Sequence, residues 1–148
     1  MSPRAKTSDI EVRPFGIDED HVADRHPVRP VRHRDVERFA HARLGPDEYY
    51  ARLPVDTSLA DGAGQSVSVV DVSARAFSIV LEGAHAVEVL CAGCPLDLAG
   101  WPVGRTSRTI FEAVEIIVTR EAEARWHVEI WRGFAPWLWA VLSAAAAD

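Results

Sequence analysis

The chain has 148 residues, of which 48% are hydrophobic, and it carries a formal net charge of −6 at pH 7. This length has room for one domain of ordinary size with a peripheral segment. The acidic excess argues against a nucleic-acid partner, because a protein that binds nucleic acid needs a basic face toward the phosphates. No apolar run is long enough to cross a bilayer, and the N-terminal MSPRAKTSDIEV has no apolar signal region. We therefore expect a cytoplasmic protein that does not interact with a membrane.

Charged residues divide the chain into two parts. Residues 1–53 contain ten Lys or Arg and ten Asp or Glu, whereas residues 54–148 contain six basic and twelve acidic residues. Proline recurs within residues 1–30 among few large apolar side chains, and such a segment cannot bury enough surface to offset its ordering entropy. We therefore expect a charged N-terminal arm with a short helix over residues 1–60, ordered only on a partner, and a folded domain over residues 61–148.

The predicted elements begin inside this arm. Apolar residues at helical spacing predict a short helix over His33–Leu44, which Gly45 and Pro46 end. Pro46–Leu53 would add one more helical turn. The Asp, Gly and Ser residues of Asp56–Gly64 predict a loop.

Beyond this loop the pattern is that of short strands interrupted by helices. Apolar residues that alternate or run together at strand length predict five strands: Ser66–Asp71, Ala76–Leu81, Arg108–Phe111, Glu115–Thr119 and Arg125–Trp131. The expected helices are Ala84–Cys91, with a buried stripe of Ala86, Val87, Leu90 and Cys91, and a last helix with Pro136 in its first turn that runs to about Ala146. This order predicts an α+β domain with a mainly antiparallel sheet and helices on one side.

The C-terminal stretch GFAPWLWAVLSAAAA contains no charged side chain. Trp137 and Trp139 lie about 200° apart on a helix at roughly 100° per residue, so one face cannot hold both. A helix that is apolar on most of its circumference is normally covered on most of it, which predicts burial against another chain. The predicted interface residues are Phe134, Trp137, Leu138, Trp139, Val141 and Leu142. The alternative is that the alanines tolerate solvent and that Trp139 lies over a loop.

The segment Cys91-Ala92-Gly93-Cys94 allows three interpretations. A redox pair needs its thiolates at a helix N-terminus, but here the expected helix precedes the cysteines. A zinc half-site would need a second Cys or His pair, which the sequence lacks at suitable spacing. The third interpretation, a structural pair of small apolar thiols, is the one we expect.

No segment of the sequence assembles a catalytic site. Walker A, Gly-x-Gly-x-x-Gly and Gly-x-Ser-x-Gly motifs are missing, and the histidines match no metal-binding spacing. Glu112 and Glu115 flank a bend and could form a carboxylate pair, but a solvated strand edge is the interpretation we favour. We therefore expect no catalytic, cofactor-binding or metal-binding residue in this chain.

Four motifs in the second part of the chain resemble one family. The motifs are Gly83-x-x-Ala86-x-x-Val89-Leu90, Gly93-Cys94-Pro95-Leu96-Asp97-Leu98, Gly104-x-x-x-Arg108-Thr109 and Arg132-Gly133-Phe134-Ala135-x-Trp137-Leu138-Trp139. They resemble the gamma subunit of heterotetrameric sarcosine oxidase, and the match covers about residues 66–146. Gly133 stands where the family more often has a serine.

The resemblance implies a fold similar to half of an aminomethyltransferase (glycine-cleavage T protein) folate-binding domain. It also implies an assembly of four different chains that oxidatively demethylates sarcosine, or a related N-methyl amino acid, with tetrahydrofolate as the one-carbon acceptor. FAD, FMN, NAD and tetrahydrofolate would bind partner subunits, with no cofactor on this chain. This chain would pack against the folate-binding half of the alpha subunit.

Within this family the motif residues Cys94, Pro95, Leu96, Asp97, Leu98 and Arg132 would be structural. Relatives with folate chemistry carry an acidic pair at the start of a central strand, where this chain has Val114-Glu115. The resemblance therefore implies a non-catalytic subunit of an oxidoreductase complex. Two alternatives stay open: a stand-alone folate-binding or one-carbon transfer protein, and the same subunit role in another N-methyl amino acid dehydrogenase, such as one acting on N-methylglutamate.

Overall fold

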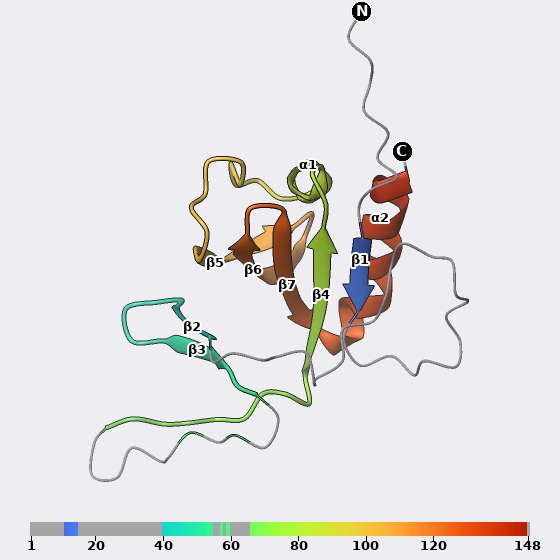
Figure 1. The fold of residues 1–148 in the computed structure, drawn as a ribbon. Helices are drawn as coiled ribbons and strands as arrows, with labels where there is room; N and C mark the ends of the chain where they lie inside the picture. The colour runs from blue at the N-terminus through green and yellow to red at the C-terminus, as the bar shows by residue number, and fades with distance from the viewer. Residues whose placement is uncertain (1–10, 15–39, 55–56, 58, 60–65, 148) are drawn as a thin grey trace, which may run out of the picture.

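A computed structural model describes residues 11–14, 40–54, 57, 59 and 66–147 of the chain. Five strands form one antiparallel sheet in the order β1-β4-β7-β6-β5 (Figure 1). Their bounds are β1 Glu11–Pro14, β4 Ala76–Glu82, β5 Thr106–Phe111, β6 Val114–Ala122 and β7 Arg125–Trp131. The remaining elements are the hairpin of β2 Ala40–Arg43 and β3 Tyr49–Arg52, helix α1 Ala86–Cys91, a 3-10 turn Arg132–Phe134 and helix α2 Ala135–Ala147.

One face of the sheet packs against the two helices and forms the hydrophobic core. Side chains alternate along a strand, so every second residue of β4, β6 and β7 points to this face. The buried residues that alternate in this way are Phe77, Ile79, Leu81, Ile116, Val118, Trp126, Val128 and Ile130. Helix α2 adds Leu138 and Leu142, and the loop after α1 adds Leu98 and Trp101. The helices on this face agree with the predicted α+β class.

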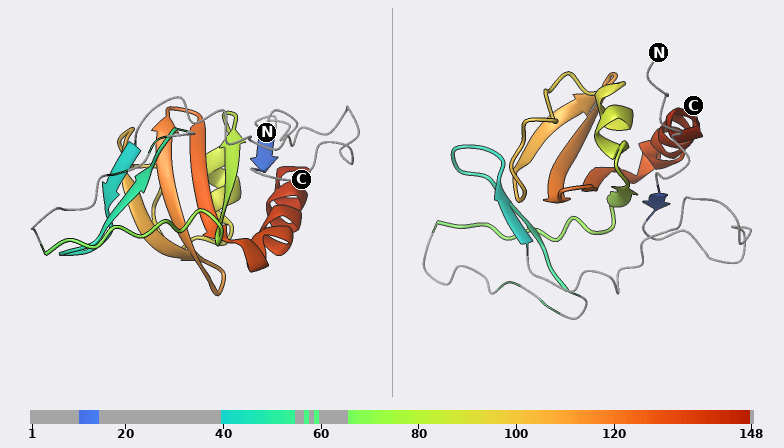
Figure 2. Two further views of the ribbon diagram at one scale, coloured as in Figure 1. Left: turned by 90° about the horizontal axis from the view of Figure 1, so that it is seen from below. Right: turned by 45° about the horizontal axis from the view of Figure 1, so that its top comes forward.

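The opposite face of the sheet, which we call the outer face, meets the β2–β3 hairpin. Figure 2 shows the hairpin and helix α1 on opposite sides of the sheet. The guanidinium of Arg52 in β3 donates to the carboxylate of Glu121 in β6 at 2.8 Å. A second ion pair joins Glu48, just before β3, to Arg108 in β5. These contacts attach a segment of the predicted arm to the sheet of the predicted domain.

The hairpin corrects the prediction for this segment. The structure places strand β2 over Ala40–Arg43, where a helix over His33–Leu44 was expected, and strand β3 where Pro46–Leu53 was expected to add a helical turn. The first seven residues of that helix, residues 33–39, lie outside the described residues. Helical spacing over so few residues also fits a strand, and here the two segments pair with each other as an antiparallel hairpin.

The other element predictions had a mixed outcome. The strand expected over Ser66–Asp71 is wrong, because these residues form no strand and are exposed. The four later strands, the helix near Ala84–Cys91 and the C-terminal helix are confirmed with small shifts at their ends. Cys91 was expected in the buried stripe of the first helix, but it is exposed, whereas Val89 is buried.

Gly93 and Glu112 show how the turn between β5 and β6 is packed. A Cβ atom on Gly93 would lie 2.5 Å from the ring of Phe111, so only glycine fits there without movement. The amide of Glu112 donates to the Gly93 carbonyl at 2.7 Å, and Glu112 has a φ of 52°. The loop after α1 therefore packs tightly against the end of β5, and this packing depends on the glycine that begins the Gly93–Leu98 motif.

Candidate functional site

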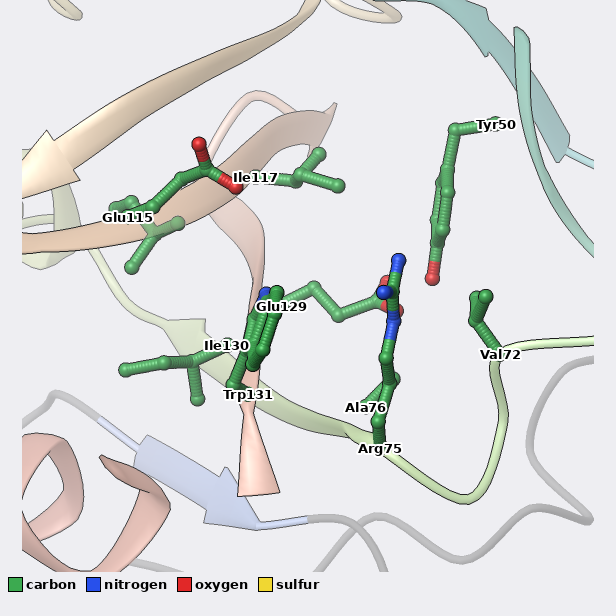
Figure 3. A pocket seen from close by; sticks show the side chains of 10 residues that line it. Tyr50, Val72, Arg75, Ala76, Glu115, Ile117, Glu129, Ile130 and Trp131 are labelled. Atoms are coloured by element: carbon green, nitrogen blue, oxygen red, sulfur yellow. The ribbon is translucent and has the colours of Figure 1, made fainter. Parts of the chain in front are cut away.

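A small pocket opens on the outer face of the sheet, between β6, β7, the hairpin and the loop that leads into β4 (Figure 3). Its walls include Tyr50 from β3, Arg75 from the loop, Glu115 and Ile117 from β6, and Trp131 from β7. We call it the Glu129 pocket, because the side chain of Glu129 extends into it from β7.

Glu129 is the unusual group in this pocket. Glu129 is only 7% exposed, and no charged or hydrogen-bonding partner among the described residues offsets the burial of its carboxyl group. Burial raises the pKa of Glu129 to about 7, because a carboxylate loses its hydration there without gaining a partner. At neutral pH this carboxyl group is therefore divided between its neutral and its ionised form.

The other acidic side chains of the outer face are paired. Glu121 accepts from Arg52 and from Arg125, at 2.8 and 3.0 Å. Burial alone would raise the pKa of Glu121, but its electrostatic interaction with His127, together with the guanidiniums of Arg52 and Arg125, holds the pKa below its ordinary value. Glu82 also pairs with Arg125, at 2.8 Å. Glu121 and Glu82 thus each have a guanidinium partner, whereas Glu129 has none.

His127 lies two residues before Glu129 on the same face of β7 and is also buried. Burial, with the positive charges of Arg52 and Arg125, lowers the pKa of His127 to about 3. The imidazole is therefore neutral at physiological pH, and it cannot serve as a cationic partner for Glu129. The outer face thus buries two titratable groups in their uncharged or partly charged forms.

The rim of the pocket is held by Arg132 and Arg75. The Nε of Arg132 donates to the carbonyl of Ala74 at 3.0 Å, and the amide of Arg132 donates to the carbonyl of Arg75 at 2.6 Å. These bonds tie the start of the 3-10 turn to the loop before β4. The guanidinium of Arg75 lies 5.0 Å from the centre of the Trp131 ring, a cation–π contact. Arg75 is thereby held on Trp131 and forms no ion pair with Glu129.

The size of the pocket limits its chemistry. Its volume is about 40 Å³, whereas a water molecule needs roughly 10–15 Å³ of such space and organic ligands occupy several hundred. A few waters or the end of one side chain would fit. The described residues contain no group of three or more His, Cys, Asp or Glu that could hold a metal ion. The geometry suits recognition of one polar group better than turnover of a substrate.

The C-terminal helix corrects part of the predicted interface. Leu138 and Leu142 are fully buried in the core of this chain, so neither can contact a partner. Trp137, Trp139 and Val141 are partly buried and pack against the same core, and the Trp137 ring meets Phe111 edge-on at 6.3 Å. The error came from treating the small domain as too small to cover most of the helix.

Phe134 is different from the other predicted interface residues. It is 49% exposed, and Trp131, three residues earlier, is 53% exposed. The two aromatic side chains bracket the 3-10 turn Arg132–Phe134, and Trp131 also lines the Glu129 pocket. Large exposed aromatic residues are enriched at protein interfaces. The sequence argument did not single out Trp131, although it ends a strand in which Trp126–Ile130 are all buried.

The family-motif residues are placed as follows. Cys94 and Leu98 are buried in the core, Leu96 is partly buried, and Pro95 and Asp97 are exposed. Arg132 is exposed but bonded to the loop before β4. Cys91 and Cys94 are both free thiols, and the exposure of Cys91 corrects the expectation of two small apolar thiols. Glu115 forms an ion pair with Arg108 at 3.7 Å, whereas Glu112 lies in the turn.

Sequence reasoning did not single out Glu129. In the sequence it alternates with apolar residues on β7, a pattern that normally places an acidic side chain in solvent. Two of the residues that enclose it, Tyr50 of the hairpin and Arg75 of the loop, are remote in sequence. No helix among the described residues is long and apolar enough to cross a membrane.

Comparisons with known proteins give these features a context. Residues 41–148 match the sarcosine oxidase, gamma subunit family. Sarcosine oxidase subunit gamma from an Arthrobacter species is 33% identical over 92 residues, covering 57% of this chain and 45% of that relative. A chain of the heterotetrameric sarcosine oxidase from Corynebacterium sp. U-96, in complex with pyrrole 2-carboxylate, aligns with a TM-score of 0.64 and 26% identity over 74% of this chain. The match covers 60% of that chain, so both relatives extend well beyond the matched part.

Proposed function

Because this chain belongs to the sarcosine oxidase gamma subunit family, we propose that it is a non-catalytic subunit of a sarcosine oxidase-type complex. The family match includes the hairpin as well as the sheet and helices, so it extends further toward the N-terminus than the motifs that first suggested it. The solved relative is described as heterotetrameric, and the same kind of assembly is proposed for this chain.

The observation that carries a subunit role is the exposed aromatic pair next to the Glu129 pocket. Trp131 and Phe134 expose about half of their surface, and they lie in or beside the Arg132–Trp139 motif that resembles the family. Such side chains at the rim of a pocket with an unpaired acid form a surface suited to another protein. We expect this surface to contact the larger alpha subunit, through its folate-binding half.

The reaction itself is proposed for the partner subunits. The complex would oxidatively demethylate sarcosine, with tetrahydrofolate as one-carbon acceptor and FAD, FMN and NAD on the other chains. The described residues support a structural role here, because the Glu129 pocket has space for a few waters and not for a pterin ring or a flavin. A fold equivalent to half of an aminomethyltransferase folate-binding domain, and a cytoplasmic location, belong to the same proposal.

Co-purification tests the proposed function. The chain is tagged in its native host, isolated at low salt, and the bound proteins are identified together with the visible absorbance spectrum. We expect larger subunits and the absorbance of oxidised flavin to accompany the chain, with sarcosine-dependent reduction of that flavin. A flavin reduced instead by N-methylglutamate would assign the subunit to another N-methyl amino acid dehydrogenase. A chain that purifies alone and binds reduced folate in a titration would contradict the subunit role.

A further inference from the structure

The chain that leads into β4 contains a segment, residues 66–71, that is composed like a strand but pairs with no strand in the described part of the molecule. Its sequence, SVSVVD, contains neither proline nor glycine, so every residue keeps a backbone N–H, and its valines favour extended structure. Val67, Val69 and Val70 are nevertheless 58%, 40% and 71% exposed. Apolar side chains gathered on an exposed surface mark an interaction site more often than a solvated loop.

The turn that follows this segment is held in place by hydrogen bonds. The amides of Arg75 and Ala76 both donate to the carbonyl of Val72, at 3.1 and 3.2 Å. Ser73 donates to the carboxylate of Asp71 twice, through its amide at 2.8 Å and through its hydroxyl at 2.6 Å. From this turn the segment (light green in Figures 1 and 2) runs away from the sheet as an extended coil. A fixed base therefore presents the segment to a neighbouring molecule.

The strand edges of this chain are short or covered. Among the described residues, β1, β2 and β3 have four residues each, and short edges discourage the addition of another strand. β1 also ends at Pro14, which has no N–H to donate. The longer edge strand β5 meets the hairpin through β2 and through the ion pair of Arg108 with Glu48. A second copy of the chain presents the same edges, which favours a different protein as the partner.

The base of the segment adjoins the exposed aromatic pair. Val72, directly after the segment, lines the Glu129 pocket together with Trp131 (Figure 3). Arg132, which follows Trp131 in the chain, donates to the turn before β4. The segment therefore begins beside the surface of Trp131 and Phe134, for which a contact with the alpha subunit is proposed.

We propose that residues 66–71 add as a strand to a free sheet edge of the larger partner subunit. Side chains alternate along a strand, so Val67 and Val69 face one side of that sheet and Val70 the other. In this mode of binding the backbone hydrogen bonds give affinity, and the contacts of alternate side chains give specificity. The strand-like sequence thus finds its pairing in the complex and not in the single chain. This inference rests on the proposed function for its partner, and it adds the segment and the mode of contact.

The first test measures the dissociation constant of the full chain for its purified partner subunits. Wild type is compared with the double variant Val67→Ser/Val69→Ser and with Val103→Ser, which removes a valine of the same 58% exposure outside the segment. We expect the double variant to bind about tenfold more weakly or worse, because the contact then loses two apolar side chains. Val103→Ser should bind as wild type does. Thermal unfolding should be the same for all three proteins, since the replaced side chains are exposed.

Hydrogen exchange tests the backbone pairing itself. The amides of residues 66–71 should exchange rapidly in the free chain and slowly in the complex. Protection should alternate along the segment, because only every second amide of an added strand faces its neighbour. Protection already present in the free chain would show that another part of this chain covers the segment, and no protection in the complex would exclude an added strand.

The outcomes separate this inference from the proposed function. If wild type binds its partner and the double variant binds equally well, the segment is not part of the contact, although the subunit role stands. An equal loss in Val103→Ser would also reject a specific segment. Sedimentation of the free chain adds a further outcome: a wild-type dimer that the double variant does not form would assign the segment to a second copy instead. If wild type binds none of the other subunits, both proposals fail.

Discussion

The helix-covered face and the outer face of the sheet are built from the same strands, but they bury different kinds of side chain. On the helix side, Ile79, Val128 and Leu138 meet in a core that is closed within this chain. On the outer face, strand β7 carries His127 and Glu129, which are also buried, on the side where the hairpin lies. The comparison shows that a face of the sheet can be covered by the chain and still bury an acidic side chain that has no charged partner.

The largest expected effect would come from Leu138→Ala. Leu138 is fully buried on the helix side, so its truncation should lower the free energy of unfolding by about 2–5 kcal/mol. Phe134→Ala, at an exposed position on the same motif, should change stability by less than about 0.5 kcal/mol and should weaken partner binding. Chemical denaturation of the isolated chain measures the stability of both variants. A similar loss in the two variants would mean that Phe134 belongs to the core.

Glu129→Gln should affect stability in a pH-dependent way. The folded-state pKa of Glu129 is raised from 4.5 to about 7, so folding is progressively opposed as the pH rises from 4.5 through 7. The variant should match wild type near pH 4 and be more stable than wild type at pH 8, by about 3 kcal/mol at most. Denaturation curves across this range measure the difference. A constant difference between the two proteins would contradict the raised pKa.

His127 should give the opposite pH dependence. Its folded-state pKa is lowered from 6.5 to about 3, so the unfolded chain takes up a proton below pH 6.5 that the folded chain refuses. Wild type should therefore lose stability relative to His127→Asn by about 1.4 kcal/mol per pH unit between pH 6 and pH 4. The comparison uses slopes, because the substitution also changes packing. Parallel curves for the two proteins would show that His127 is charged or exposed.

Gly93→Ala tests the packing beneath the helix side. The added methyl group would meet the Phe111 ring at 2.5 Å, so the ring or the loop must shift, and we expect a loss of about 1–3 kcal/mol. Gly133→Ala is the matched control, because a Cβ atom at Gly133 meets nothing within 4 Å. Thermal unfolding of the two variants side by side measures the effect. Equal stability would show that the loop moves freely.

The smallest expected effect concerns the hairpin. Arg52→Gln removes one of the two guanidiniums at Glu121 but leaves Arg125, so we expect a loss of no more than about 1 kcal/mol. Hydrogen exchange should show faster opening of Tyr49–Arg52 without faster opening of β7. If β7 opens as readily as the hairpin, the hairpin and the sheet form one cooperative unit, and the two faces are less independent than described.

The sequence predicts the helix side of this fold well and the outer face poorly. Strands such as Arg125–Trp131 show a clear alternation, and the C-terminal helix is marked by Pro136, so local patterns suffice. The hairpin was taken for a helix, because short segments such as Ala40–Arg43 carry little periodic signal and depend on tertiary contacts. The family resemblance, carried by the Gly93–Leu98 and Arg132–Trp139 motifs, was confirmed by the family match.

The candidate site could not be predicted for a related reason. Glu129 is an ordinary strand glutamate until Tyr50, 79 positions earlier in the chain, and Arg75 are brought around it. The predicted interface instead counted the apolar residues of the last helix, and Leu138 and Leu142 proved to be core residues. Composition identifies a helix that must be covered, but it does not say whether the chain itself provides the cover.

The most direct test of the account is an NMR titration of the Glu129 carboxyl carbon in the free chain. In the free chain we predict a pKa near 7, because the group is buried without a partner. A pKa near the ordinary value of 4.5 would contradict the claim that the outer face buries Glu129 without a charged partner.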